Sequence, residues 1–199
     1  MKKKRPYRMS ERAKSQEETR LRIVEATMKL HEEIGPRATT ISAIAEEAGV
    51  RRLTVYRHFP DETAVFQACT SHWLSLNPPP NPETWMGHDD PWKRLRVAVG
   101  EFYAYYSRTR RMWTVSFRDV RLVPALQEPM GEFEHFVASI AAGLAEPFGA
   151  RGARQQRLET TLAHILAFPT WADLHERGLE AAAMLATVEH WVHGVVDGK

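Results

Sequence analysis

Apolar and small side chains recur at intervals of three and four residues near the start of the chain, which places them on one helix face. The members of this stripe are Ile23, Thr27, Leu30 and Ile34. Gly35 and Pro36 end the run, because glycine accepts the backbone that closes a helix and proline cannot continue one. The pattern predicts a helix from about residue 16 to residue 34.

Three shorter helical segments follow before the first proline-rich stretch. Thr40 is the expected N-cap of a helix of about two turns, which Gly49 ends. The next segment, residues 50–59, stops before Pro60. Asp61 is the expected cap of a fourth helix over residues 61–76. The predicted buried face of this fourth helix consists of Val65, Phe66, Cys69, Trp73 and Leu76.

Residues 77–91 contain five prolines, which excludes regular structure and indicates a linker. Helical patterns return beyond it. The expected segments are 91–108, 110–120, 124–147, 153–177 and 179–197. Pro169 is expected to kink the fourth of these. No alternating apolar and polar run is typical of a strand, so the predicted fold class is all-α.

The second and third helices have the spacing of a helix-turn-helix. Ala45 is small where the second helix of such a motif crosses the first, and Gly49 supplies a turn with positive φ at little cost. The side chains expected to fill the angle between the helices are Ile44, Val50 and Val55. In this motif the second helix lies in the major groove of DNA and presents its N-terminal residues to base edges.

The residues that combine these features are Ile23, Ala26, Gly35, Thr39, Thr40, Ile44, Ala45, Ala48, Gly49, Val50, Val55, Tyr56, Arg57, His58 and Phe59. Together they resemble the N-terminal domain of TetR/AcrR-type transcriptional regulators, over about residues 16–76. The resemblance implies an Ω-shaped homodimer with a three-helix DNA-binding domain. It also implies a larger helical ligand-binding and dimerisation domain, whose last two long helices form a four-helix bundle with the partner.

The charge distribution agrees with this reading. Residues 1–60 carry 14 Lys/Arg and 8 Asp/Glu, whereas residues 61–199 carry 13 and 17. A basic N-terminal third fits a module that binds a polyanion. The single cysteine, Cys69, excludes an internal disulfide. No signal-peptide core and no membrane-spanning stretch is present in the sequence, so we expect a cytoplasmic protein that has no membrane partner.

The resemblance and the residue chemistry together predict the contacts with double-stranded DNA. The candidates are Thr39 and Thr40 for phosphate, Arg51, Arg52 and Thr54 for base edges, Tyr56 and His58 for phosphate, Arg57, and Lys2, Lys3, Lys4 and Arg5 in a basic arm. Core packing is the alternative for Tyr56 and His58, and packing against the neighbouring helix is the alternative for Arg57. A solvated tail is the alternative for the arm.

Three positions depart from the family pattern. Arg51-Arg52-Leu53 replaces a small residue and a glycine, which adds two cations to the recognition helix. Asp61-Glu62 stands where the family usually places a lysine, and Glu62 would repel a phosphate. His31 replaces a bulky apolar residue and is interpreted as a core histidine.

The C-terminal part is rich in aromatic residues. The predicted effector-binding residues are Phe102, Tyr103, Tyr106, Trp113, Phe117, Phe136, His164, Phe168 and Trp171, with Phe133 beside them. Such a set suits a pocket for an apolar or aromatic small molecule. The alternative is that these side chains only form the core of the domain.

The last helix, from residue 179 to about residue 196, has two apolar faces. One consists of Met184, Val188, Trp191 and Val195, and the other of Leu179, Ala182, Ala183 and Ala186. A helix that is apolar on two sides needs two partners, and the second is expected to be the same helix of another subunit. A homodimer would place two recognition helices roughly 34–36 Å apart, on a palindromic operator.

The expected domains are a flexible basic arm over 1–15, a helix-turn-helix domain over 16–60, a connecting helix over 61–76 and an effector-binding and dimerisation domain over 77–199. The predicted function is a repressor that a small molecule releases from DNA; the alternative is a ligand-independent regulator whose C-terminal domain serves dimerisation or partner binding. No nucleotide-binding or hydrolase motif occurs, and His190 and His193 alone do not make a metal site. We therefore expect no enzymatic activity, no cofactor and no metal.

Overall fold

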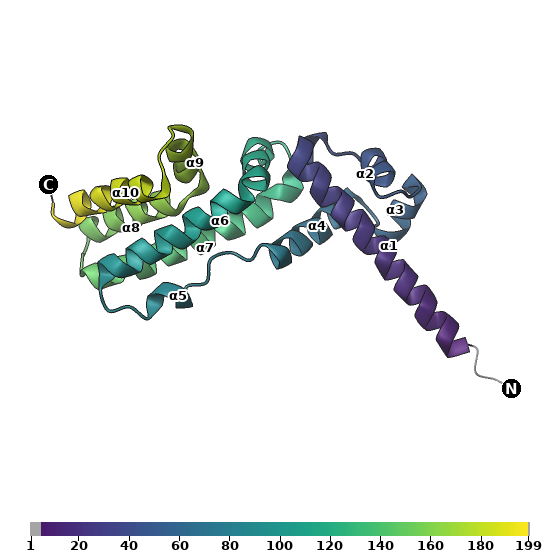
Figure 1. Cartoon of the computed structure of the whole chain (residues 1–199), viewed down its shortest axis with the longest axis horizontal. Helices are drawn as coiled ribbons and strands as arrows, with labels where there is room; N and C mark the ends of the chain where they lie inside the picture. The colour runs from purple at the N-terminus through teal and green to yellow at the C-terminus, as the bar shows by residue number, and fades with distance from the viewer. Residues whose placement is uncertain (1–4, 199) are drawn as a thin grey trace. The chain divides into compact units, whose positions relative to one another are not determined.

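The computed structural model describes residues 5–198, except the side chains of residues 5–10 and 12. Over this range the chain forms α-helices, two short 3-10 helices and turns, without a strand, so the all-α prediction is confirmed (Figure 1). None of the described helices is both long and apolar enough to cross a membrane. The chain divides into two compact units. The N-terminal unit comprises the described residues up to Asn77 together with Thr114–Gln127, and the C-terminal unit comprises the remainder.

Four helices form the body of the N-terminal unit. They are α1 (Arg5–Ile34), α2 (Ile41–Glu47), α3 (Arg52–His58) and α4 (Glu62–Leu76). Their shared core consists of Ile23, Val24, Ala26, Ile41, Ile44, Ala45, Ala48, Val55, Phe59 and Val65. The expected caps are confirmed: Thr40 accepts a hydrogen bond from the Ala43 N–H and Asp61 accepts one from the Ala64 N–H. Local side-chain chemistry therefore sets where α2 and α4 begin.

The first helix is longer than the sequence pattern predicts. It begins at Arg5 instead of about residue 16, so the arm expected to be flexible up to residue 15 is helical from Arg5. Residues 5–15 contain no glycine, and Pro6 lies in the first turn, where its missing N–H costs no helical hydrogen bond. Figure 1 shows α1 extending past α2 and α3. Lys2, Lys3 and Lys4 lie outside the described residues, as does the side chain of Arg5.

The N-terminal unit also contains the end of α6, which the sequence did not predict. The Arg118 guanidinium forms two hydrogen bonds to the Asp119 carboxylate, at 2.8 and 3.0 Å, and a third to the Ile34 carbonyl at 2.9 Å. Asp119 in turn accepts a hydrogen bond from the Arg37 N–H at 3.1 Å. A Cβ on Gly35, whose φ is 93°, would lie 1.9 Å from the Arg118 Nη2 atom. We call this arrangement the Arg118–Asp119 clasp.

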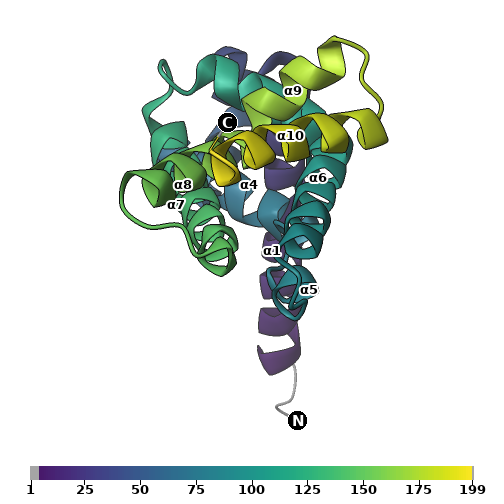
Figure 2. The same ribbon diagram turned by 90° about the vertical axis from the view of Figure 1, so that its left-hand side faces the viewer.

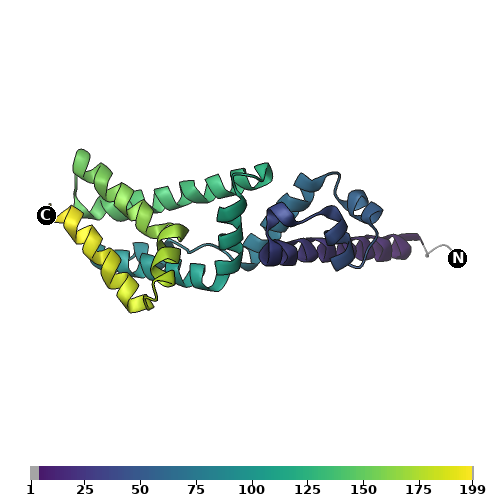
Figure 3. The same ribbon diagram turned by 90° about the horizontal axis from the view of Figure 1, so that it is seen from above.

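The C-terminal unit is a bundle of longer helices. They are α5 (Glu83–Met86), α6 (Pro91–Asp119, of which the last turns belong to the other unit), α7 (Pro124–Ala145, of which the first turn belongs to the other unit), α8 (Ala153–Leu166), α9 (Phe168–Glu176) and α10 (Ala181–Val196). Helices α6 and α7 run antiparallel to each other (Figure 3). Helices α8 and α10 lie side by side at one face of the bundle (Figure 2).

Three segment predictions for this part are corrected. The two helices expected over 91–108 and 110–120 are one helix, because the polar residues between them include neither glycine nor proline. The proline-rich linker contains one helical turn, and its Trp85 is fully buried with its ring 6.2 Å from that of Phe102. The kink expected at Pro169 is a complete break: Ala167 is extended and α9 starts anew with Pro169 in its first turn.

Candidate DNA-binding surface

The helix-turn-helix is built by a short loop between α2 and α3. Gly49 adopts φ 64°, a conformation that costs a residue with a side chain more than it costs glycine. The Val50 N–H donates to the Ala45 carbonyl at 2.9 Å, which closes the turn directly against α2. Ala45 is buried, as its predicted place under the crossing helix requires. The loop thus fixes the direction in which α3 leaves α2.

Helix α3 has one apolar face and one basic face. Val55 and the following Phe59 are buried in the core of the unit. Arg51 and Arg52 are exposed at the start of the helix, and Thr54 is half-buried beside them. Since the face opposite the core carries the cations, this side of α3 is the one that can approach a polyanion. The three residues predicted to reach base edges therefore lie together at the N-terminal end of α3.

The two residues with a core-packing alternative differ in exposure. Tyr56 is 38% exposed, so core packing is wrong for it. The Arg52 guanidinium lies 5.7 Å from the Tyr56 ring centroid and donates to its hydroxyl at 3.4 Å. His58 is half-buried, and its pKa is lowered by burial and then by the neighbouring Arg57 and Arg20. A neutral His58 still offers one ring N–H to a phosphate oxygen.

The hydroxyl groups of the two threonines that precede α2 form different hydrogen bonds. The Thr39 hydroxyl donates to the Gly35 carbonyl at 2.9 Å, so its proton is used within the protein. The Thr40 hydroxyl oxygen accepts from the Ala43 N–H at 3.2 Å and keeps its own proton free to donate. Of the two, Thr40 is the better phosphate donor in this conformation.

Acidic residues border the basic face, as the sequence indicates. Asp61 is occupied as the cap of α4, since it accepts from the Ala64 N–H at 2.8 Å. Glu62 is exposed in the first turn of the same helix. The hydrogen bond to Tyr56 raises the pKa of the Arg52 guanidinium most, and the nearby carboxylate of Glu62 raises it further. Glu62 therefore offsets part of the positive charge of α3.

His31 is buried under this domain, as its interpretation as a core histidine predicts. Its ring centroid lies 5.2 Å from that of Phe66, and its Nδ1 lies 3.7 Å from the Cys69 sulfur. Burial lowers the pKa of His31 to about 4, although the charge of Asp119 acts in the opposite direction. The imidazole is therefore neutral at pH 7.

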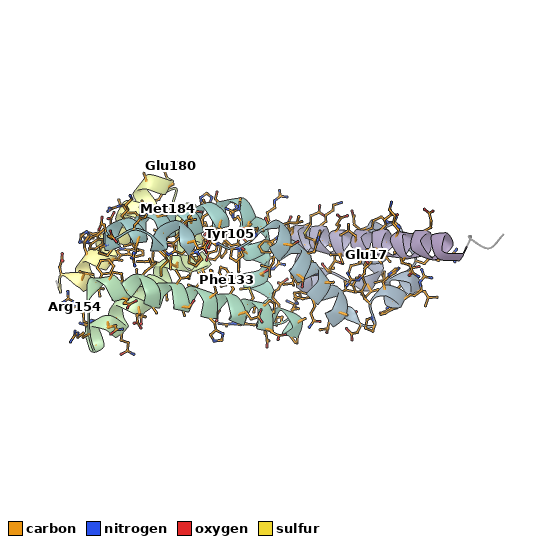
Figure 4. The ribbon with its side chains drawn as sticks, turned by 90° about the horizontal axis from the view of Figure 1, so that it is seen from below. Glu17, Tyr105, Phe133, Arg154, Glu180 and Met184 are labelled. Atoms are coloured by element: carbon orange, nitrogen blue, oxygen red, sulfur yellow. The ribbon has the colours of Figure 1, made fainter. Side chains whose placement is uncertain are left out.

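Most of the predicted effector-binding residues meet in one cluster in the C-terminal unit. The Trp113 ring centroid lies 4.5 Å from that of Phe133 and 6.0 Å from that of Phe168. In Figure 4, Tyr105 of α6 and Phe133 of α7 lie between their two helices, and their ring centroids are 6.3 Å apart. The rings that share these contacts are Phe102, Tyr105, Tyr106, Trp113, Phe133, Phe136, Phe168 and Trp171. We call this set the aromatic cluster.

The end of α8 holds the polar edge of the aromatic cluster. The Tyr106 hydroxyl donates to the Leu166 carbonyl at 2.8 Å, and the Tyr103 hydroxyl donates to the Ile165 carbonyl at 3.1 Å. Burial raises the pKa of both phenols, so they remain protonated donors. These bonds satisfy carbonyls that lose their helical partners where α8 breaks.

Three predicted effector residues lie outside the aromatic cluster. Tyr103 borders it through the hydrogen bond to the Ile165 carbonyl. His164 is exposed on α8, because the buried positions of that helix are Leu158, Leu162, Ile165 and Leu166. Phe117 belongs to the N-terminal unit with the end of α6. Both placements result from helix phase and length, which the sequence pattern did not resolve for α6 and α8.

The last helix presents a row of small residues to solvent. Met184, Val188 and Val192 face the unit and are buried. Trp191, which the sequence analysis placed on the same apolar face as Met184 and Val188, is exposed, because the buried row follows intervals of four residues. The exposed small residues are Ala181, Ala182, Ala183 and Ala186. Figure 4 marks the start of this helix with Glu180 and Met184.

Comparison with known proteins identifies the N-terminal unit. Residues 23–69 match the family described as bacterial regulatory proteins of the tetR family, so the resemblance seen in the sequence is confirmed. No curated protein matches the chain significantly. A TetR-like transcriptional regulator from Rhodococcus sp. RHA1 has a similar structure, with a TM-score of 0.64 and 21% identity over 91% of this chain and 97% of that one. A TetR transcription regulator from Haloarcula marismortui ATCC 43049 gives a TM-score of 0.61 and 14% identity, over 92% and 98%. At such identities the two structures show a shared fold.

Proposed function

We propose that this transcriptional regulator of the TetR family is a cytoplasmic repressor that binds a palindromic operator as a homodimer and leaves it when an apolar or aromatic molecule binds. The observation that carries the proposal is the division of α3 into a buried apolar face and an exposed basic face. Arg51, Arg52 and Thr54 stand at its exposed N-terminal end, where a recognition helix meets base edges. Tyr56, His58 and Thr40 supply polar groups for the phosphates.

The exposed alanines of α10 support the homodimer. A helix face made of small residues lets a second helix approach closely, and an equivalent face on a second copy makes the contact self-complementary. Helix α8 lies beside α10 and completes a two-helix surface. Two copies of this surface give a four-helix bundle. The two-fold axis of such a dimer matches the symmetry of a palindromic site.

The aromatic cluster supports control by an apolar ligand. Its rings supply a large apolar surface, and Tyr103 and Tyr106 supply hydroxyls that can exchange a carbonyl partner for a ligand. Helix α6 carries part of the cluster and, farther along the same helix, the Arg118–Asp119 clasp on the helix-turn-helix domain. A ligand that shifts α6 therefore acts on the N-terminal unit through the same element, in addition to any coupling through α4.

The ligand-independent regulator is the second candidate. The rings of the cluster already contact one another, and the hydroxyls of Tyr103 and Tyr106 are already paired. A cluster in which all these groups are satisfied serves equally well as a core. The two candidates differ in whether a small molecule changes DNA affinity.

The test begins with selection of DNA duplexes from a random library by the purified protein, followed by gel shifts on the enriched sequence. We expect a two-fold symmetric sequence bound by two protomers. Uncharged aromatic compounds are then added to the complex, and release of the DNA together with a change in tryptophan fluorescence supports the effector. Stable binding in the presence of every compound favours the ligand-independent regulator. Failure to enrich any sequence contradicts both.

A further inference from the structure

Leu53 is the most exposed large apolar side chain among the residues whose side chains the structure describes. It is 80% exposed, in the second position of α3, between Arg52 and Thr54. The apolar face of α3 is already supplied by Val55, which is fully buried, and by Phe59 just beyond the helix. Leu53 therefore contributes no packing to the fold of the protomer.

The surroundings of Leu53 distinguish it from an isolated surface leucine. Arg51 and Arg52 precede it, and Arg57 lies one turn farther along the helix, all with exposed side chains. Three cations around one apolar side chain attract a polyanion and disfavour an apolar protein surface, because such a surface would desolvate the guanidinium groups. The positive charge of these three arginines therefore favours DNA as the molecule that contacts Leu53.

One chemical group in the major groove of DNA, the C5 methyl group of thymine, can pack against an exposed aliphatic side chain. The edges of guanine, cytosine and adenine offer hydrogen-bond donors and acceptors there, whereas thymine also offers its C5 methyl group. A leucine placed against a polar edge would leave that edge without a partner. Placed against the thymine methyl, it buries apolar surface on both molecules.

We propose that Leu53 determines specificity by contacting the C5 methyl group of one thymine in each operator half-site. The inference rests on the proposed function, since it requires that α3 enter the major groove. It adds a residue that the predicted DNA contacts did not include. It also states the chemistry of one operator position, namely a pyrimidine that carries a methyl group.

The experiment uses the full-length protein and the duplex enriched by selection, with each thymine replaced in turn by deoxyuridine, which removes only the methyl group. Burying one methyl group stabilises by about 0.8 kcal/mol, so we expect about fourfold weaker binding when the contacted thymine of one half-site is replaced. With Leu53→Ala, the thymine and deoxyuridine duplexes should bind equally. Leu53→Gln, which replaces the apolar side chain with a polar one of similar size, should behave in the same way.

Leu76→Ala is the matched control. Leu76 is also an exposed leucine of the N-terminal unit, at 58%, and it ends α4. This variant should keep the fourfold preference for thymine. Because Leu53 is exposed, its variants should unfold at the temperature of the wild type, and a thermal melt followed by circular dichroism checks this.

The outcomes separate the inference from the proposed function. If no sequence is enriched, sequence-specific binding fails and the inference fails with it. If a sequence is enriched but no deoxyuridine weakens binding, only the inference is overturned. It is also overturned if Leu53→Ala and Leu53→Gln keep the thymine preference, because the methyl group then contacts another residue.

Discussion

The backbone N–H of Arg37 donates a hydrogen bond to the carboxylate of Asp119, 82 residues away in the sequence, at 3.1 Å. Asp119 is only 2% exposed, and its pKa is lowered by the hydrogen bond from Arg118 and further by Arg37. The clasp therefore holds the turn between α1 and α2 by a charged hydrogen bond that is shielded from water.

Replacing Asp119 with asparagine tests the energetic importance of the clasp. The amide keeps one acceptor but loses the charge that pairs with Arg118, so we expect the free energy of unfolding to fall by about 2 kcal/mol. Chemical denaturation followed by circular dichroism measures it. Asp173→Asn is the control, because Asp173 pairs with Arg177 at an exposed site, where solvent screens the pair and it contributes little stability. Equal losses in the two variants would contradict a special role for Asp119.

The buried His31 predicts a pH dependence of stability. Its pKa is about 4 in the folded protein and about 6.5 in the unfolded chain, so the unfolded state binds the proton more tightly. Stability is therefore lost as the pH falls from about 6.5 to about 4. His31→Leu should reduce the loss between pH 7 and pH 4.5 by about 2.5 kcal/mol, as measured by denaturation at both pH values.

The carboxylates of the protein contribute equally to wild type and His31→Leu, so the difference between the two isolates the imidazole. His135→Gln, at an exposed position of α7, is the control for loss of a histidine. If His31→Leu loses as much stability between pH 7 and pH 4.5 as the wild type does, the imidazole takes up no proton on unfolding.

Replacing Glu62 with a cation is expected to strengthen DNA binding. Glu62→Lys removes a negative charge beside the basic face of α3 and adds a cation, so operator affinity should rise several-fold at low salt. One new phosphate contact should steepen the slope of log K against log salt by about 0.9. Glu134→Lys, on the exposed surface of α7, makes the same change in net charge and should leave the slope unchanged. An equal effect of both substitutions would indicate a general effect of charge.

The alanine face of α10 predicts how the proposed homodimer can be broken. Ala183→Arg places a long charged side chain on the row of small residues, so sedimentation should show a single species of 22.8 kDa in place of the dimer. Its affinity for the full palindrome should fall toward that for a half-site. Ala104→Arg, at an exposed position of α6, should remain dimeric. A dimeric Ala183→Arg protein would place the interface elsewhere.

The helix-turn-helix was predictable because its signals are local. The caps Thr40 and Asp61 act on N–H groups three residues away, and Gly49 determines a turn of a few residues. Each of these interactions is contained in a short window of sequence. Hydrophobic spacing then indicated which faces of these helices are buried.

The remainder depended on interactions that no short window contains. Nothing near Asp119 in the sequence indicates that it accepts from Arg37, and the polar residues around Arg110 imitate a helix end inside α6. Trp85 is buried although it lies among prolines, because its partner Phe102 comes from another helix. Leu53 was noted as a departure from the family pattern, but its exposure required the structure.

Gly35 has a consequence for protein engineering. The Arg118 guanidinium occupies the space that a Cβ at residue 35 would fill. Arg118 belongs to Thr114–Gln127, so the N-terminal unit is made from two separate stretches of the chain. A chimera joined at residue 77 would bring a foreign helix-turn-helix domain against Arg118 and Asp119, which bond to Ile34 and Arg37 of this one. Transplanting Thr114–Gln127 together with the first 77 residues keeps the Arg118–Asp119 clasp with the residues that it contacts. These two stretches should therefore be exchanged together.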